Sequence, residues 1–173
     1  MGAKGFYLVE DGHLAWLINQ AHELNAADHH LPVVNMQNWN HVDFVVFFGT
    51  SPRAAAVITV ESCSNWVDLE GAPTTTTKIA FNYHARLTSQ ITAGNDVDTA
   101  KTAVTVAATG LIPTAGVDDI IYIIPLDADQ LVSGHIGFRL DIVNAGAGCL
   151  ATIFAICSGA RYAGSLGTTV LST

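Results

Sequence analysis

The sequence predicts an all-β protein: a single antiparallel β-sandwich, or jelly-roll-like domain, with one short N-terminal helix. Three observations lead to this prediction. Most of the chain consists of short runs rich in β-branched and aromatic residues, turn-forming residues separate these runs, and no strand–helix–strand rhythm recurs. A chain of 173 residues is one ordinary domain, and folding at this size buries about 70% of the unfolded surface, which is enough for one core.

The helix is predicted near the start of the chain. Apolar side chains recur there with the i, i+3, i+4, i+7 spacing of one helix face, at Leu14, Leu17, Ile18, Ala21 and Leu24. Asp11 stands in front of them as an N-cap. The sequence therefore predicts a short amphipathic helix from Leu14 to Leu24.

Strands are predicted for most of the remaining chain, over residues 42–48, 54–62, 79–86, 102–108, 119–125, 136–143 and 150–156. Residues 54–62, 79–86 and 136–143 alternate between two sets of side chains, as strands do. Residues 42–48 (VDFVVFF) form an apolar, β-branched and aromatic run, and residues 150–156 (LATIFAI) close the series. Pro125 is expected to stop the strand that begins at residue 119. A helical turn with Asp127 as its N-cap should follow over 127–131, and the Thr-rich residues 71–78 should form a loop.

The whole chain, residues 1–173, is expected to be this one domain. Residues 1–5 are predicted to be a flexible N-terminal arm and residues 163–173 a C-terminal tail. Two interpretations of these ends remain open. Either they are frayed termini, or they are contact arms that can add to a neighbour's sheet.

Charge is scarce in this sequence. Lys and Arg number 7 and Asp and Glu number 15, so that 13% of residues are charged and the net charge is -8, against about 25% charged residues in an average soluble domain. The high apolar content excludes intrinsic disorder, and the few scattered cations argue against nucleic-acid binding. Either the chain enters a membrane, or much of its surface meets protein.

The membrane alternative is not favoured. The two longest uncharged runs, 142–160 and 102–117, are interrupted at strand length by Gly, Asn or Pro. The N-terminus has no apolar stretch of signal-peptide type. Cys63, Cys149 and Cys157 are an odd number without an export signal, and we expect them to be reduced and buried.

No motif predicts catalysis, a metal or a cofactor. His22, His29 and His30 lie near acidic residues but lack the spacing of a zinc site, and we expect a polar loop there. Asp127 and Asp129 lack the rest of a calcium loop. There is no GxSxG nucleophile motif and no phosphate-binding loop. The expectation is a protein that is not an enzyme.

Three tryptophans allow a further alternative. Trp16, Trp39 and Trp66 could form a sugar-stacking platform on a sandwich, or they could belong to the core. The core interpretation is favoured.

Five segments stand out by their order along the chain: 7–14 (YLVEDGHL), 39–49 (WNHVDFVVFFG), 120–131 (IIYIIPLDADQL), 138–140 (FRL) and 151–163 (ATIFAICSGARYA). In these segments and their order the sequence resembles small virion proteins of tailed bacteriophages. The likeness spans nearly the whole chain, but it consists of layout and short phrases without a catalytic motif. The chain departs from it in the Thr-rich loop and at His29 and His30.

The resemblance implies a head decoration or cement protein, a structural protein that binds the outside of the capsid shell and stabilises it. Its partners would be the major capsid protein and further copies of itself, as a homotrimer, with no nucleic acid and no membrane. It would be made in the cytoplasm of the host bacterium and end on the capsid exterior. Interfaces of this kind are poor in charge, which agrees with the composition.

The residues expected at protein interfaces are Phe6, Tyr7, Trp39, Arg161, Tyr162, Val170 and Leu171. One alternative stays within the virion: a tail, connector or fibre-base component. Another is a carbohydrate-binding sandwich that uses Trp39 or Trp66. An enzyme is the last alternative.

Overall fold

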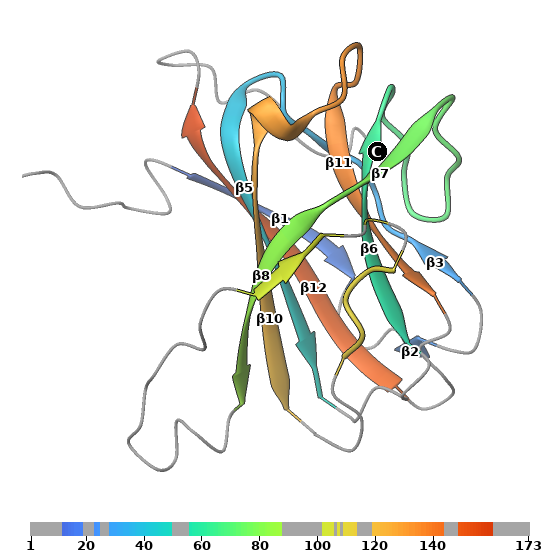
Figure 1. Cartoon of the computed structure of the whole chain (residues 1–173), viewed down its shortest axis with the longest axis vertical. Helices are drawn as coiled ribbons and strands as arrows, with labels where there is room; N and C mark the ends of the chain where they lie inside the picture. Colours follow the sequence, from blue (N-terminus) through green and yellow to red (C-terminus); the bar gives the residue numbers. More distant parts are fainter. Residues whose placement is uncertain are drawn as a thin grey trace, which may run out of the picture.

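The computed structural model describes residues 12–18, 23–24, 28–49, 56–87, 102–105, 107, 109–113, 119–143 and 149–160. These residues form two antiparallel sheets that pack face to face, so the predicted all-β sandwich is confirmed (Figure 1). No helix among them is long and apolar enough to cross a membrane.

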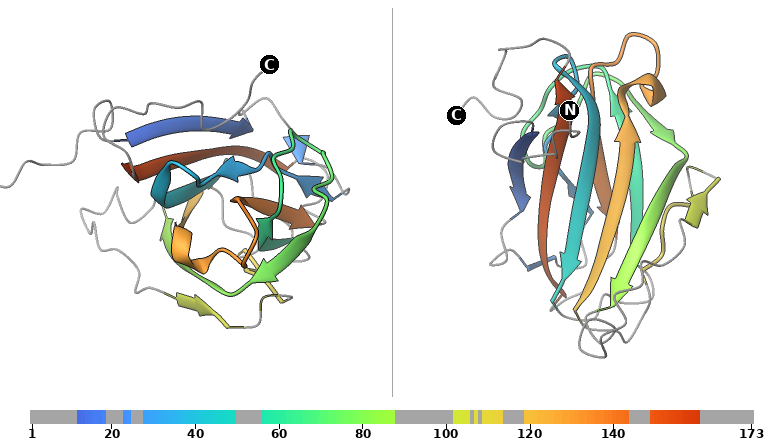
Figure 2. Two further views of the ribbon diagram at one scale, coloured as in Figure 1. Left: turned by 90° about the horizontal axis from the view of Figure 1, so that it is seen from above. Right: turned by 90° about the vertical axis from the view of Figure 1, so that its left-hand side faces the viewer.

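The first sheet has seven strands. Its order is β1 (Gly12–Ile18), β12 (Cys149–Ala160), β5 (Trp39–Phe48), β10 (Ile120–Asp127), β8 (Phe81–Leu87) and β9 (Thr102–Val104), and β2 (Glu23–Leu24) also pairs with β12. Figure 2, right, looks onto this sheet and shows β1, β12, β5, β10 and β8 side by side in this order.

The second sheet has five strands. Its order is β3 (His29–His30), β11 (Gly137–Val143), β6 (Val57–Cys63) and β7 (Thr76–Ile79), and β4 (Val34–Asn35) also pairs with β11. Seen from above, the two sheets curve around a common interior (Figure 2, left).

The chain passes from one sheet to the other between β7 and β8. Only Ala80 separates them, yet β7 pairs with β6 in the second sheet and β8 pairs with β10 in the first. In Figure 1 the two strands form one long green ribbon that crosses the sandwich diagonally. The corner closes one side of the molecule.

The core lies between the inward faces of the two sheets. Trp39, Phe44, Phe48, Tyr122 and Phe138 are its largest fully buried side chains, each at most 2% exposed. The ring of Tyr122 meets the ring of Phe48 edge-on, with centroids 6.2 Å apart. Tertiary packing of this kind fixes which face of each strand points inward.

The predicted N-terminal helix is wrong. Residues 12–18 form β1, which pairs antiparallel with β12. Ala15 and Leu17 point into the core, 4% and 6% exposed, whereas Leu14 and Trp16 point outward, 39% and 58% exposed. Because the outward side chains are apolar too, the strand shows no polar–apolar alternation, and its apolar residues happened to match helical spacing.

Several boundaries also differ from the prediction. Pro125 does not stop the strand predicted to begin at residue 119. That strand is β10, which continues to Asp127 and pairs Pro125 with Asp43 of β5. The short helical turn is confirmed as a 3-10 helix, η1 (Ala128–Gln130), where Gln130 Oε1 accepts the Asp127 N–H at 2.8 Å.

Two predicted loops are partly strands. The last residues of the Thr-rich segment belong to β7, which extends the second sheet beside β6. His29 and His30 form β3 rather than a loop, because their backbone pairs with Ile142 and Asp141 of β11.

Candidate interaction face

The outward surface of the seven-stranded sheet is apolar over most of its width. Alternate residues of β12, β5 and β10 point away from the core there and are only partly buried. The apolar residues among them, together with two outward residues of β1, are called the apolar face. It consists of Leu14, Trp16, Val45, Phe47, Ile121, Ile123, Pro125, Leu150, Phe154 and Ile156. Antiparallel sandwiches commonly present polar residues on such a surface.

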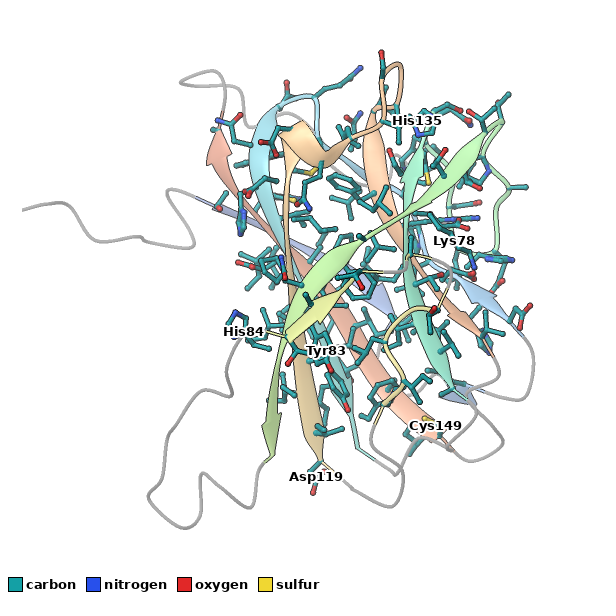
Figure 3. The ribbon with its side chains drawn as sticks, viewed as in Figure 1. Lys78, Tyr83, His84, Asp119, His135 and Cys149 are labelled. Atoms are coloured by element: carbon teal, nitrogen blue, oxygen red, sulfur yellow. The ribbon has the colours of Figure 1, made fainter. Side chains whose placement is uncertain are left out.

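The strand register joins these side chains into one patch. Trp16 pairs with Phe154, Phe154 with Val45, and Val45 with Ile123, so one row crosses β1, β12, β5 and β10. Neighbouring strands lie about 4.8 Å apart, and the row is therefore roughly 14 Å wide. The rings of Trp16 and Phe154 are in contact, with centroids 5.6 Å apart. The row ends beside His84 of β8, which Figure 3 labels.

One end of the apolar face is acidic. His41 of β5 lies between two carboxylates: its Nδ1 is 2.7 Å from Asp127 Oδ1 and its Nε2 is 3.2 Å from Asp43 Oδ1. Asp127 and Asp129 also line a surface hollow of about 380 Å³ with Asn40. We call Asp43, Asp127 and Asp129 the acidic end.

The carboxylates change the titration of His41. Burial is the largest single influence and lowers the pKa, but the hydrogen bond to Asp127 and the negative charge of Asp43 outweigh it. The pKa of His41 is therefore raised above its ordinary value. The imidazolium form is favoured because it can donate from both ring nitrogens at once.

The outward side of the second sheet carries charged side chains, unlike the apolar face of the first. Arg139 of β11 donates from Nε to Glu61 Oε2 of β6 at 2.7 Å, and both residues are less than a tenth exposed. Asp141 Oδ1 lies 2.8 Å from His30 Nδ1, and Asp141 Oδ2 lies 3.6 Å from Lys78 Nζ. Figure 3 shows Lys78 on this side of the molecule. Lys78 and Arg139, the two cations whose side chains are described, thus belong to ion pairs on the second sheet.

The described residues offer little for catalysis. No group of three or more His, Cys, Asp or Glu side chains among them could hold a metal ion. Burial raises the pKa of the Cys63 and Cys157 thiols to about 12 and raises that of Cys149 as well. Free, buried thiols of this kind are poor nucleophiles.

One residue expected at an interface lies elsewhere. Trp39 is 1% exposed in the core, where its ring stacks on His13 with centroids 6.2 Å apart. It therefore offers no surface for a protein or sugar contact. The other expected contact residues lie outside the described part of the chain: Phe6, Tyr7, Arg161, Tyr162, Val170 and Leu171, together with the arm 1–5 and the tail 163–173.

The apolar face was not predicted as a site from the sequence. A signal for it was present, because residues 42–48, 120–125 and 150–156 are apolar apart from Asp43 and Thr152. In a sandwich, such a run means that both faces of a strand are apolar. The core can account for only one of the two faces.

Comparisons with known proteins add no relative. No protein-family model, no curated protein and no solved structure matches the chain.

Proposed function

We propose that this chain is a structural protein of a tailed-bacteriophage virion, and specifically a capsid decoration or cement protein. In this proposal it binds the outside of the major capsid shell, stabilises the shell and carries out no catalysis. The observation that carries the proposal is the apolar face, which spans four strands of an otherwise ordinary sandwich. The resemblance of the sequence to phage head proteins supplies the class of partner.

The physical argument rests on the cost of leaving this surface in water. Burying apolar area contributes about 25 cal/mol per Å², and large contiguous apolar patches on soluble proteins usually mark interaction sites. Trp16, Leu14 and Leu150 are each more than a third exposed. Aromatic residues such as Trp16 and Phe154 also dominate the energy of protein interfaces. The scarcity of charge in the sequence agrees with a surface that meets protein.

Co-sedimentation with phage heads tests the proposal. The probe is heads purified without this protein, from the phage whose genome encodes it. A triple variant, Trp16→Thr, Val45→Thr and Ile123→Thr, keeps strand propensity but makes the central row polar, and we expect it to stay in the supernatant. Val57→Thr with Val143→Thr, two partly buried positions paired on the second sheet, is the matched control and should pellet with heads. Wild-type protein that never pellets with heads would refute the proposal.

The proposed homotrimer is tested separately. Light scattering after size-exclusion chromatography should give about three times the chain mass of 18.2 kDa. A stable monomer would remove the trimer from the proposal. Electron microscopy of the particle would distinguish a head protein from a tail, connector or fibre-base component.

A second candidate function rests on Trp16. Trp16 is 58% exposed, and its ring leans at 55° against that of Phe154. Such a pair is the kind of aromatic platform on which sugars stack. A carbohydrate-binding module would bind on a glycan array and lose that binding on Trp16→Ala. A cement protein would show no glycan binding in either form.

A further inference from the structure

We infer that the apolar face docks on a different protein, whose contact surface is apolar and carries Lys or Arg side chains opposite Asp43, Asp127 and Asp129. A second copy of this chain, which is itself acidic, fits this surface less well. The inference rests on the proposed function only in taking the capsid shell as the source of this partner.

The first step is that the apolar face and the acidic end are one surface. Asp43 and Val45 are neighbours on the outward side of β5, and Asp127 follows Pro125 on the same side of β10. Residues two apart on a strand lie about 7 Å from each other. A partner that covers Val45 and Pro125 therefore also lies against the two carboxylates.

The second step is that these carboxylates need a cation. The side chains of Asp43 and Asp127 are 33% and 65% exposed, so a docked partner would take water away from them. Removing water from an unpaired carboxylate is costly, whereas a partner cation at this rim compensates and also guides the approach. His41 balances at most one of the three acidic charges, because a protonated imidazole carries a single positive charge.

A second copy fits the acidic end less well than a protein with a basic contact surface does. The chain carries a net charge of -8, so its copies repel one another at an acidic rim. Among the described side chains, both cations are already engaged on the second sheet: Arg139 with Glu61, and Lys78 with Asp141. Arg86, at the β8 position that pairs with Ile121, is the one Lys or Arg that the described backbone places on the seven-stranded sheet, and Ile121 lies towards the opposite end of β10 from Asp127.

Two labelled peptides serve as the probe. Both are amphipathic helices with the same leucine face; one carries lysine on its polar face and the other glutamate. Fluorescence anisotropy should show binding of the lysine peptide to the wild-type protein and weakening with added salt. The glutamate peptide should bind at least tenfold more weakly. Equal binding of both peptides would overturn the inference.

Charge variants locate the effect. Asp43→Asn, Asp127→Asn and Asp129→Asn together should weaken binding of the lysine peptide roughly five- to tenfold and flatten its salt dependence. The matched control removes three exposed carboxylates elsewhere: Asp28→Asn, Asp68→Asn and Asp119→Asn. Asp119 lies at the other end of β10 (Figure 3), and Asn tolerates its positive φ of 54°. An equal loss in both triple variants would mean that only net charge matters, which would overturn the inference.

Two further measurements complete the test. Asp129→Lys reverses one exposed charge without removing a hydrogen bond of His41, and it should also weaken lysine-peptide binding. Sedimentation should give the same mass for wild type and for Val45→Thr with Ile123→Thr. A smaller mass for that variant would show that copies meet through the apolar face and would overturn the inference. Failure to bind heads refutes the proposed function, whereas failure of the peptide pattern refutes this inference.

Discussion

Arg139 and Glu61 form a buried ion pair on the outward side of the second sheet, with Nε and Nη2 of the arginine each 2.7 Å from the same carboxylate oxygen. Both side chains are less than a tenth exposed, and Arg139 Nη1 also donates to the carbonyl oxygen of Gly71 at 2.9 Å. The pair therefore ties β6 to β11, and its arginine also ties them to the loop between β6 and β7. It also places two charged side chains on the second sheet, whereas the outward surface of the first sheet is mostly apolar.

Removing one partner of this pair should destabilise the protein strongly. We expect Glu61→Leu to lower the free energy of unfolding by about 3–5 kcal/mol, because Arg139 would stay buried without a counter-charge. Urea unfolding followed by circular dichroism measures the change. The double variant Glu61→Leu with Arg139→Met should recover most of the loss. A double variant that is less stable than the single one would contradict this account.

The two tryptophans Trp39 and Trp16 should respond in opposite ways to truncation. Trp39→Ala should cost about 3–5 kcal/mol of unfolding free energy, since it empties a large part of the core. Trp16→Ala should cost less than about 1 kcal/mol, because the side chain is mostly exposed. Under the proposed cement function, binding to phage heads should nevertheless fall with Trp16→Ala. Equal destabilisation by the two variants would mean that Trp16 is covered within the folded chain.

His41 should make stability depend on pH in a defined direction. Its pKa is raised in the folded protein, so its contribution is fully present below the pKa of an unfolded histidine and is lost as the pH rises through the folded value. The stability difference between wild type and His41→Gln should therefore be larger at pH 5.5 than at pH 8.5. Because the group is partly exposed, we expect a change below about 1 kcal/mol. A difference that grows towards alkaline pH would contradict the assignment.

The three cysteines should be inert in the folded protein. With the pKa of Cys63 and Cys157 near 12, almost no thiolate exists at pH 8, and burial blocks access as well. A thiol-specific reagent such as iodoacetamide should label none of them in native protein within an hour. All three should react in denaturant. Rapid labelling of Cys149, the first residue of β12, would show that this end of the strand opens.

The fold class could be predicted because apolar and polar residues alternate along β6 and β11 in the sequence. Val60 and Leu140 point inward on these strands, whereas Glu61 and Arg139 point outward. The helix prediction for β1 failed for the opposite reason. Leu14 and Trp16 are apolar on the outward side, so the period of two was hidden. The same outward apolar side chains that misled the prediction belong to the apolar face.

The candidate site was less predictable than the fold. Mostly apolar runs belong to β5, β10 and β12, which are neighbours in one sheet, whereas two of the three alternating runs belong to β6 and β11 in the other. Strand order is set by long-range pairing, which single-strand patterns do not reveal. The meeting of His41 with Asp127, 86 positions away, is a consequence of that pairing. Trp39 was assigned to an interface because sequence alone does not show which face of β5 it occupies.

The corner at Ala80 has a mechanical consequence. Since β7 and β8 are separated by that one residue, the outer strand of one layer continues directly into a strand of the other. Tension applied to the seven-stranded layer is transmitted into the second layer along covalent backbone as well as through side-chain packing. The two layers therefore bear a load as one body, and they can slide past one another only if β7 or β8 first detaches from its neighbour.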